Sequence, residues 1–272
     1  GNKADVDELD LLKYLHKDAD TDVIMMYLEQ LKRGGQEFVE TVREITSGKN
    51  PTPILAIKSG RTGAGAAAAS SHTGSIAGSE GVYDAIFAET GIIRVESVNE
   101  LFDYAGAFAA KKFPRGKRIA IVTNAGGPGI VATDMTEVSG LELARFSPET
   151  TEVLASHLPP TANINNPVDV IGDADPDRYH NALDAVIKDE NTDSALVILT
   201  PQSMTNAIKT ARVISKIARR TPKPVVCAFM GVIDVSEGVR HLQENHIPVY
   251  RFPENAAKAI GALYRSEQWV HR

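Results

Sequence analysis

Short apolar runs and stretches with helical spacing alternate along almost the whole chain. The apolar runs indicate buried strands, and between them hydrophobic residues recur every three or four positions, as on one face of a helix. The predicted strands cover residues 21–28, 53–57, 92–95, 118–123, 141–144, 194–200, 225–230 and 248–250. The predicted helices cover residues 6–16, 34–47, 81–89, 98–111, 130–139, 175–188, 203–219, 235–244 and 253–269, and Ser147 opens one more. Strands that alternate with helices predict parallel sheets with helices on both faces.

The best candidate for a linker is FPRGK at residues 113–117, which places Pro, Gly and basic residues between two periodic segments. After it the alternation restarts and gives a doubly wound domain with five strands, in which residues 159–169 are predicted to be irregular. The fold class is therefore α/β, with two doubly wound, parallel-sheet domains of the flavodoxin type. The first five residues have the composition of a loop already inside a fold, so the first domain is expected to be truncated at its N-terminus.

Strand 21–28 is nearly all apolar, so both of its faces are expected to be covered. It ends at Glu29, and the next strand leads into a segment rich in Gly, Ala, Ser and Thr, residues 58–81, with His72 at its centre. Small residues let the backbone come close to a ligand and leave N–H groups free to point at it. This segment is expected to be a loop ahead of a helix, which is an arrangement suited to anions.

Composition narrows the classes of function. Lys and Arg number 29 and Asp and Glu number 35, giving a net charge of −6, which argues against nucleic acid as the main partner. No apolar run approaches ~18 residues, so no membrane span is expected, and no signal-peptide pattern is recognised. Cys227 is the only cysteine and lies in an apolar strand pattern, which predicts a core residue in a cytoplasmic protein.

In open α/β sheets, ligands bind at the carboxyl ends of the strands. Four features are predicted to lie there: Glu29, the His72 segment, the glycine-rich NAGGPG turn at residues 124–129, and the turn at residues 200–203, which is predicted to open a helix. Two such turns at helix N-termini suit phosphate or carboxylate. The alternative is that NAGGPG has a structural role only, because the turn after the strand needs glycine for steric reasons. For NAGGPG taken by itself, this structural explanation is the better supported one.

The His72 segment has alternatives of its own. Most histidines do no chemistry, and spacing alone supports catalysis and a structural role equally. Gly63, Gly65 and Ala68 also match the G-x-G-x-x-A dinucleotide fingerprint. That reading is rejected, because no second strand ends in an acidic residue about 20 residues on, and because residues 70–75 are expected to break the helix that the fingerprint needs.

Several motifs together carry a resemblance to a known family. GNKADVDELDLLKYL, MMYLEQL, KSGR, ASSHTGSIAGSEGVYDAIF and VTNAGGPGIVATD occur here in that order. The chain closely resembles the NDP-forming acyl-CoA synthetases, which include the ADP-forming acetate–CoA ligases and are related to succinyl-CoA synthetase. The resemblance covers essentially the whole chain, and the combination is specific although each motif alone is weak.

The resemblance implies a division into an incomplete, phosphohistidine-bearing ligase domain at residues 1–112 and a second flavodoxin-like ligase domain at residues 116–272. It also implies that the CoA-binding Rossmann domain and the ATP-grasp domain or subunit lie outside this chain, as partners. CoA, ADP or ATP, and Mg²⁺ are then expected for the complete enzyme, with none bound by this chain on its own. A small carboxylic acid is the implied substrate, and an oligomer is expected.

The resemblance further implies roles for individual residues. His72 matches the histidine that takes a phosphoryl group from an acyl phosphate and passes it to the nucleotide. Glu29 matches the glutamate that holds the other imidazole nitrogen. Backbone amides at Gly74 and Ser75, and at Gln202 and Ser203 with Pro201 before them, are the candidate phosphate donors. No metal ligand is assigned, because the remaining histidines form no Cys/His cluster.

Two rival functions remain. The family also supplies non-catalytic regulators in fused protein acetyltransferases, which sense acyl-CoA or nucleotide and tend to have lost the histidine. His72 is present, which favours the enzyme. A generic doubly wound binding module accounts for the fold and leaves the combination of His72 and Glu29 to chance.

Overall fold

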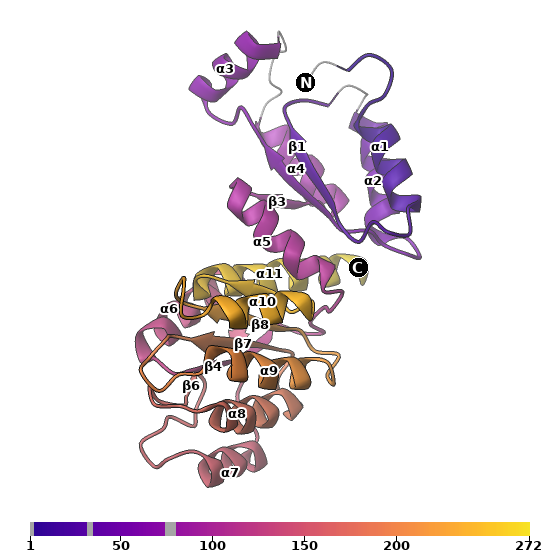
Figure 1. The fold of residues 1–272 in the computed structure, drawn as a ribbon. Coiled ribbons are helices and arrows are strands. Elements are labelled where there is room, and N and C mark those ends of the chain that lie inside the picture. Colours follow the sequence, from indigo (N-terminus) through magenta and orange to yellow (C-terminus); the bar gives the residue numbers. More distant parts are fainter. Residues whose placement is uncertain (1–2, 32–34, 74–79) are drawn as a thin grey trace. The chain divides into compact units, whose positions relative to one another are not determined.

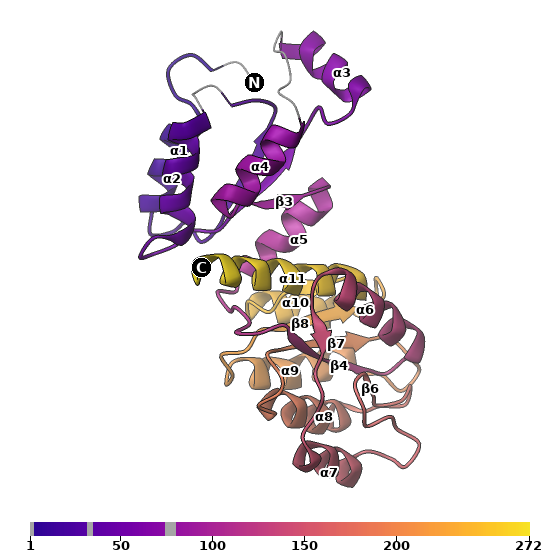
Figure 2. The same ribbon diagram turned by 180° about the vertical axis from the view of Figure 1, so that it is seen from behind.

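The computed structural model describes residues 3–31, 35–73 and 80–272, without the side chains of residues 69–73. The chain divides into two compact units, one formed by Gly1–Ala109 with Arg265–Arg272 and the other by Ala110–Tyr264. Both are parallel sheets flanked by helices (Figures 1 and 2), as the alternating pattern predicted.

The first unit contains a three-stranded parallel sheet in the order β1-β2-β3. Its strands are β1 (Ile24–Leu28), β2 (Ile54–Lys58) and β3 (Ile93–Val95). Its helices are α1 (Glu8–Lys17), α2 (Gly35–Ser47), α3 (Gly63–Thr73), α4 (Glu80–Thr90) and α5 (Val98–Ala109). Helices α1, α2 and α4 lie on one face of the sheet (Figure 2), and α5 lies on the other (Figure 1).

The core of the first unit lies between the sheet and helices α1, α2 and α4. Its buried members are Leu9, Leu12, Ile24, Leu28, Phe38, Val42, Ile45, Ile54, Ala56, Tyr83, Phe87 and Ile92. The predicted helix starts are physically supported here: the Asp7 side chain accepts from the Leu9 and Asp10 amides and caps α1. Ser97 caps α5 by accepting from the Glu100 amide at 3.1 Å.

The expectation that strand 21–28 is covered on both faces is wrong. Met25 is 36% exposed and Tyr27 is 64% exposed, whereas Ile24 and Leu28 on the alternate face are buried. The reason is that α5 packs over β2 and β3. Among the described helices of the first unit, none covers β1 on the face of the sheet where Met25 and Tyr27 lie. The apolar run therefore predicted the strand correctly, but it did not predict which faces of the strand are covered.

The second unit is built on a parallel sheet in the order β5-β4-β7-β8-β9, and β6 also pairs with β4. Its strands are β4 (Arg118–Thr123), β5 (Glu142–Leu143), β6 (Val168–Asp169), β7 (Ser194–Leu199), β8 (Val225–Phe229) and β9 (Val249–Tyr250). Its helices are α6 (Gly126–Val138), α7 (Pro148–His157), α8 (Pro176–Lys188), α9 (Ala207–Ala218), α10 (Ser236–Glu244) and most of α11 (Pro253–Val270). Helices α8, α9 and α10 cover one face of this sheet, and α6 and α11 cover the other (Figures 1 and 2).

Two local predictions in the second unit are corrected. The segment predicted to be irregular contains β6, because the Asn166 side chain bonds the Ile121 amide and the Ile119 carbonyl and so holds the segment beside β4. The NAGGPG turn is largely helical, since α6 already begins at Gly126. The cap predictions for Ser147 and for the Asp175–Pro176 helix start are confirmed.

Candidate functional site at the carboxyl edges of the sheets

Glu29 lies where the sequence predicted it, directly after β1. The register pairs Leu28 with Lys58 at the last residues of β1 and β2. The Ser59 amide then donates to the Leu28 carbonyl at 3.0 Å and ties the two strand ends together. Glu29 is half-buried. The segment that carries His72 therefore leaves the sheet at the edge where Glu29 stands.

Lys58 is buried at this same edge, with only 2% of its surface exposed. Its ammonium lies 4.7 Å from the centre of the Tyr83 ring on α4 and donates to the Ser59 carbonyl. Burial lowers the pKa of Lys58; Glu80 raises it, Arg94 lowers it and Glu29 raises it by smaller amounts. The net effect is a lowered pKa, as expected for an ammonium removed from water.

The structure corrects the prediction of a loop around His72. Residues Gly63–Thr73 form helix α3, so His72 is the penultimate residue of a helix. The run of alanines explains this, because alanine has the highest helix propensity of all residues. One argument against the dinucleotide fingerprint, a break in the helix before His72, is thus wrong. The His72 side chain is not described, and Gly74 and Ser75 lie outside the described residues.

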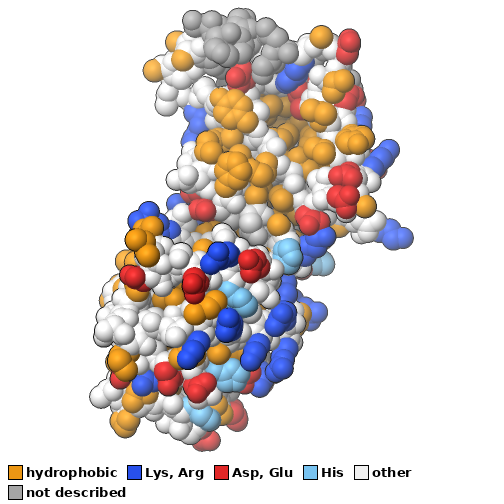
Figure 3. All heavy atoms as spheres, viewed as in Figure 1, with side chains coloured by type: hydrophobic (Ala, Val, Ile, Leu, Met, Phe, Trp, Pro, Cys, Tyr) orange, Lys and Arg blue, Asp and Glu red, His pale blue; other side chains and the backbone are white. Residues whose placement is uncertain are grey.

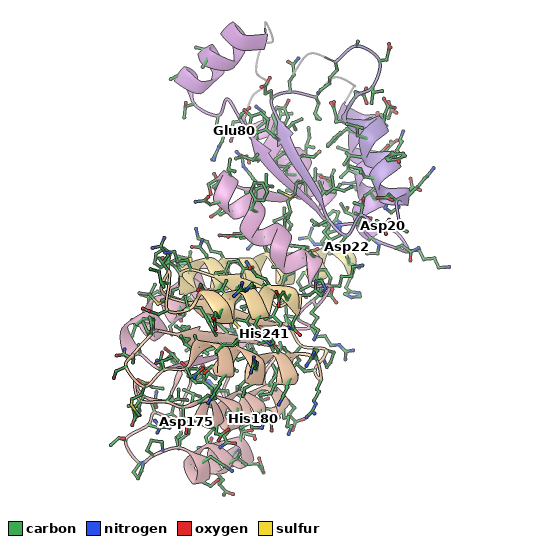
Figure 4. All side chains as sticks on the ribbon, viewed as in Figure 1. Asp20, Asp22, Glu80, Asp175, His180 and His241 are labelled. Atoms are coloured by element: carbon green, nitrogen blue, oxygen red, sulfur yellow. The ribbon has the colours of Figure 1, made fainter. Side chains whose placement is uncertain are left out.

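A network of ion pairs joins the two ends of the His72 segment. Arg61, just before α3, pairs with Glu80 at the first residue of α4, with Nε and Oε1 3.0 Å apart, and also with Glu96. Arg94 on β3 pairs with Glu80, Asp84 and Glu96. Figure 4 shows Glu80 at the start of α4, whereas Asp20 and Asp22 lie at the opposite, amino end of β1. The network anchors both ends of the segment to the carboxyl edge of the sheet.

In the second unit, Asn124 joins the carboxyl ends of β4 and β7. Its side-chain amide donates to the Thr200 carbonyl at 2.8 Å, and its side-chain oxygen accepts from the Thr200 amide at 2.8 Å. Asn124 is 2% exposed. Gly172 lies beside the backbone of Asn124 and the side chain of Gln202. Three connections therefore meet at one edge, which is the position predicted for a ligand site.

The turn that follows β7 differs from its prediction. Gln202 and Ser203 are exposed and precede the helix, because α9 begins only at Ala207 with Asn206 as its cap. The Gln202 amide donates to Thr205 Oγ1 at 3.0 Å. These residues therefore do not form the first turn of a helix, and the predicted helix start at residue 203 is wrong.

The described part of the chain also bears on metal ligands, on Cys227 and on membrane spans. Residues 3–31, 35–73 and 80–272 contain no group of three or more His, Cys, Asp or Glu placed to hold a metal ion. Figure 4 shows His180 on α8 and His241 on α10. Cys227 is completely buried, which confirms the core prediction, and burial raises the pKa of its thiol. None of the described helices is long and apolar enough to cross a membrane.

Two surface features lie away from these edges. A cavity of about 840 Å³ in the second unit is lined by residues of β4, β5, α6 and the loops around them, among them Arg118, Glu142, Arg145 and Asn166. On the first unit, the exposed large hydrophobic side chains of β1 and α5 are Met25, Tyr27, Val98 and Phe102. Figure 3 shows that hydrophobic side chains gather on the viewed face of this unit. Neither feature includes a residue predicted for the site.

Lys58, Asn124 and Thr200 belong to segments that the sequence placed at these edges, but the sequence assigned no individual role to any of them. A lysine that closes the otherwise apolar run ILAIK was the available signal for Lys58, because a charged residue at the end of a buried strand faces the ligand-binding edge. Asn124 carried no comparable signal. Its role depends on the pairing of β4 with β7, which are separated by about 75 residues of sequence.

Comparison with known proteins finds a matching protein family for each of the two units. Residues 1–108 match the family described as the succinyl-CoA ligase like flavodoxin domain, and residues 119–272 match the family described as the Ligase-CoA domain. A 4-hydroxybutyrate–CoA ligase (ADP-forming) of Nitrosopumilus maritimus is 39% identical over 99% of this chain and 38% of its own length. The alpha subunit of acetate–CoA ligase (ADP-forming) I of Pyrococcus furiosus is 38% identical over 99% of this chain and 58% of its own length.

A solved structure agrees with these matches. The dinucleotide forming acetyl-coenzyme A synthetase 1 of Ca. Korarchaeum cryptofilum, in complex with phosphate and ADP, superposes with a TM-score of 0.92. It is 36% identical, and the match covers all of this chain and 59% of that chain. The chain thus spans between about two fifths and three fifths of the length of these relatives.

Proposed function

Because this chain belongs to the Ligase-CoA domain family, we propose that it is the phosphohistidine-bearing part of an ADP-forming acyl-CoA synthetase. The complete enzyme converts acyl-CoA, phosphate and ADP into a carboxylic acid, CoA and ATP. In this proposal residues 1–112 form the histidine-bearing ligase domain and residues 116–272 form the second ligase domain. The observation that carries the proposal is that Glu29 and the segment carrying His72 leave the same edge of the same sheet.

The proposed reaction has three steps. Phosphate attacks the acyl-CoA carbonyl, the C–S bond breaks, and CoA leaves as an acyl phosphate forms. A nitrogen of His72 then attacks phosphorus, the bond from phosphorus to the acyl oxygen breaks, and the carboxylate leaves. Finally a terminal oxygen of ADP attacks the phosphohistidine, the P–N bond breaks, and ATP forms with neutral His72.

Each residue has a defined task in these steps. His72 needs one ring nitrogen with a free lone pair, so its other N–H must be held by an acceptor. Glu29 is that acceptor, since a carboxylate both orients the ring and stabilises its positive charge when it carries the phosphoryl group. Amides at Gly74 and Ser75 supply hydrogen bonds to the phosphoryl oxygens, and the amides at Gln202 and Ser203 are the phosphate donors proposed for the second unit. Of these donors, the Gln202 amide must first release Thr205 Oγ1.

The chain requires partners in this scheme. A CoA-binding Rossmann domain and an ATP-grasp domain, fused or as a separate subunit, would supply the CoA, nucleotide and Mg²⁺ sites. The relatives support this division, because one of them is named an alpha subunit and each extends beyond the matched segment. The acid is a small carboxylic acid such as acetate. Relatives named for acetate and for 4-hydroxybutyrate match this chain about equally well, so the overall similarity does not distinguish between these acids. The free thiol of Cys227 is in keeping with a cytoplasmic enzyme. The oligomer is proposed from the family resemblance alone.

The experiment that tests the proposal is phosphoryl transfer to the protein. The complete enzyme is incubated with Mg²⁺ and ATP labelled at the γ-phosphate, and protein-bound label is tested for lability in acid and stability in base. Wild-type enzyme should carry such label, His72→Ala should carry none, and His157→Ala, which changes an exposed histidine on α7, should be labelled like wild type. If neither wild type nor variant is labelled while acyl-CoA still binds, the regulatory role is supported and the proposal is wrong.

A further inference from the structure

Every exposed position on helix α9 and its C-terminal end carries a positive charge. Residues 207–220 contain no Asp or Glu, and the exposed residues among them are Lys209, Arg212, Lys216, Arg219 and Arg220. With 3.6 residues per turn, these positions fall within an arc of about 100° and extend over about 16 Å of the helix axis. We call this face the α9 basic stripe. Figure 3 shows Lys and Arg side chains gathered over α9 on the viewed face of the second unit.

The charges of the α9 basic stripe are not neutralised by neighbouring residues. Four of its side chains have no ion-pair partner in the part of the chain that the structure describes, and the fifth, Arg219, donates to the neutral amide oxygen of Asn245 at 3.2 Å. The adjacent helices differ in this respect. On α8, Lys188 pairs with Asp184 one turn away, with Nζ and Oδ2 2.6 Å apart, and α10 exposes residues of both signs.

Helix stability does not explain the amino-terminal half of the stripe. Cations near the end of a helix complement its dipole, which accounts for Lys216, Arg219 and Arg220. Lys209 is the third residue of α9, where the positive end of the dipole disfavours a cation, and the first turn contains no acid to offset it. Arg212 and Lys216 lie four residues apart, a spacing at which like charges destabilise a helix. The stripe therefore costs the helix stability, and this cost points to a task outside the fold.

The position of the stripe distinguishes between anionic partners. It runs along the outer face of a helix over several turns, whereas a small anion needs donors that converge on one point. The apolar side of α9 is buried in the core, so this helix has no apolar face to insert into a membrane. The whole chain carries a net charge of −6, which opposes the approach of nucleic acid or anionic lipid. An acidic protein surface fits best, because its carboxylates can be spread over the same distance.

We propose that the α9 basic stripe is the docking surface for an acidic protein surface in the part of the enzyme that lies outside residues 1–272. This chain covers 38% of the length of the Nitrosopumilus maritimus ligase and 58% of the Pyrococcus furiosus alpha subunit, so those relatives contain further protein surface. The inference rests on the proposed function for the identity of the partner. It adds the face of this chain that the partner contacts and the charge that the partner carries there.

Carbodiimide cross-linking tests whether carboxylates lie against the stripe. The reagent joins a lysine amine directly to an Asp or Glu carboxyl group in contact with it, and mass spectrometry identifies both residues. In the complete enzyme at low salt, Lys209 and Lys216 should be linked to acidic residues outside residues 1–272. The yield should fall at least tenfold in 1 M sodium chloride, where charges are screened beyond about 3 Å.

Two results of this experiment would overturn the proposal. The first is the absence of such links, which is also the result expected if nucleic acid, lipid or a small anion occupies the stripe. The second is that the stripe is linked only to residues 1–272, whether of the same copy or of a second copy of this chain.

Charge reversal separates docking from folding. Lys209→Glu combined with Arg212→Glu places acids in the amino-terminal half of α9, one of them four residues before Lys216, so the midpoint of urea unfolding should equal or exceed that of wild type. Links from Lys216 to the partner should fall at least tenfold, because like charges then face each other. The matched control, Lys49→Glu with Arg115→Glu, makes the same change in net charge at exposed positions outside the helices and should leave these links unchanged. Loss of stability in the α9 variant, or unchanged links from Lys216, overturns the proposal.

The outcomes for the two proposals are distinct, because cross-linking requires no catalysis. Links from the stripe to acidic residues outside residues 1–272, without phosphoryl label on wild-type enzyme, keep the docking surface and reject the proposed function. Label that is lost in His72→Ala, without such links, keeps the proposed function and rejects only the docking surface.

Discussion

Asn124 and Thr200 lock the ends of two strands together. The Asn124 side chain donates to the Thr200 carbonyl and accepts from the Thr200 amide, both at 2.8 Å, and it also accepts from Thr200 Oγ1 at 3.1 Å. One buried side chain thereby satisfies the backbone of a residue that lies beyond the last strand residue of β7. These bonds hold the ends of β4 and β7 together at the point where their loops diverge.

This relationship predicts the effect of removing the Asn124 side chain. Asn124→Ala should lower the free energy of unfolding by about 2–4 kcal/mol, because two backbone groups of the half-buried Thr200 lose their partners and a buried side chain is removed. Urea unfolding followed by circular dichroism measures the loss. Asn165→Ala, which shortens an exposed asparagine in the same unit, should change stability by only about 0.5 kcal/mol. Equal effects of the two changes would show that the Asn124 bonds contribute little.

Asp193 and Arg118 predict a stability that depends on pH. The Arg118 guanidinium bonds both Asp193 oxygens, at 2.9 and 3.0 Å, and the Arg118 amide donates to one of them at 3.0 Å. Burial alone would raise the pKa of Asp193, but the bonds from Arg118 outweigh it and hold that pKa below its ordinary value of 3.8. The unfolded chain therefore takes up the proton first, so the stabilisation is complete above about pH 3.8 and is lost as the pH falls through the folded-state value.

The variant Asp193→Asn tests this directly. It should cost about 1.5–3 kcal/mol near neutral pH, and its difference from wild type should shrink below pH 3.8 in urea unfolding measured across pH. The control is Glu142→Gln, which breaks the neighbouring pair between Lys117 and Glu142, where both side chains are about half exposed. An exposed pair contributes little to stability, because water and salt screen it. A pH-independent effect of Asp193→Asn would contradict the account.

Two helical glycines should respond in opposite directions to the same substitution. A Cβ on Gly238 of α10 would lie 2.8 Å from the Ala207 carbonyl oxygen and 3.1 Å from the Phe229 ring, whereas a Cβ on Gly106 of α5 meets nothing within 4 Å. Gly106→Ala should stabilise the protein by about 0.5–1 kcal/mol through helix propensity. Gly238→Ala should destabilise it by about 1–2 kcal/mol, because overpacking against α9 and β8 outweighs the same gain. Thermal unfolding of the two variants distinguishes the signs, and stabilisation by both would be inconsistent with close packing at Gly238.

Cys227 should be unreactive in the folded protein. The thiol is completely buried on β8, and burial raises its pKa, so neither access nor thiolate is available at pH 8. An aromatic disulfide reagent should release almost no chromophore from the native chain and one equivalent from the chain in guanidinium chloride. Rapid reaction of the native protein would mean that β8 opens readily or that the thiol is not in the core.

The predictions from sequence were most accurate where a local cause was sufficient. Ser147 and Asp175 cap their helices as expected, because the cap is a contact between residues three apart in the chain. The site was predictable to the extent that Glu29 follows a strand. It was not predictable for Asn124, whose partner Thr200 lies 76 residues away. The helix that carries His72 does not follow from its glycines and hydroxyl residues, which favour a loop, and only the alanines of the segment indicate it.

The amino-acid sequence by itself determined the parallel α/β architecture and the order of its elements. Both follow from hydrophobic periodicity and chain order, since a strand followed by a helix returns to a parallel neighbour. Tertiary structure alone decided which strand faces are covered, as the exposed Tyr27 shows, and which residues meet at the carboxyl edges, as the bonds between Asn124 and Thr200 show. The physical reason is that burial and electrostatic interaction depend on neighbours in space, which strand pairing brings together from distant parts of the chain.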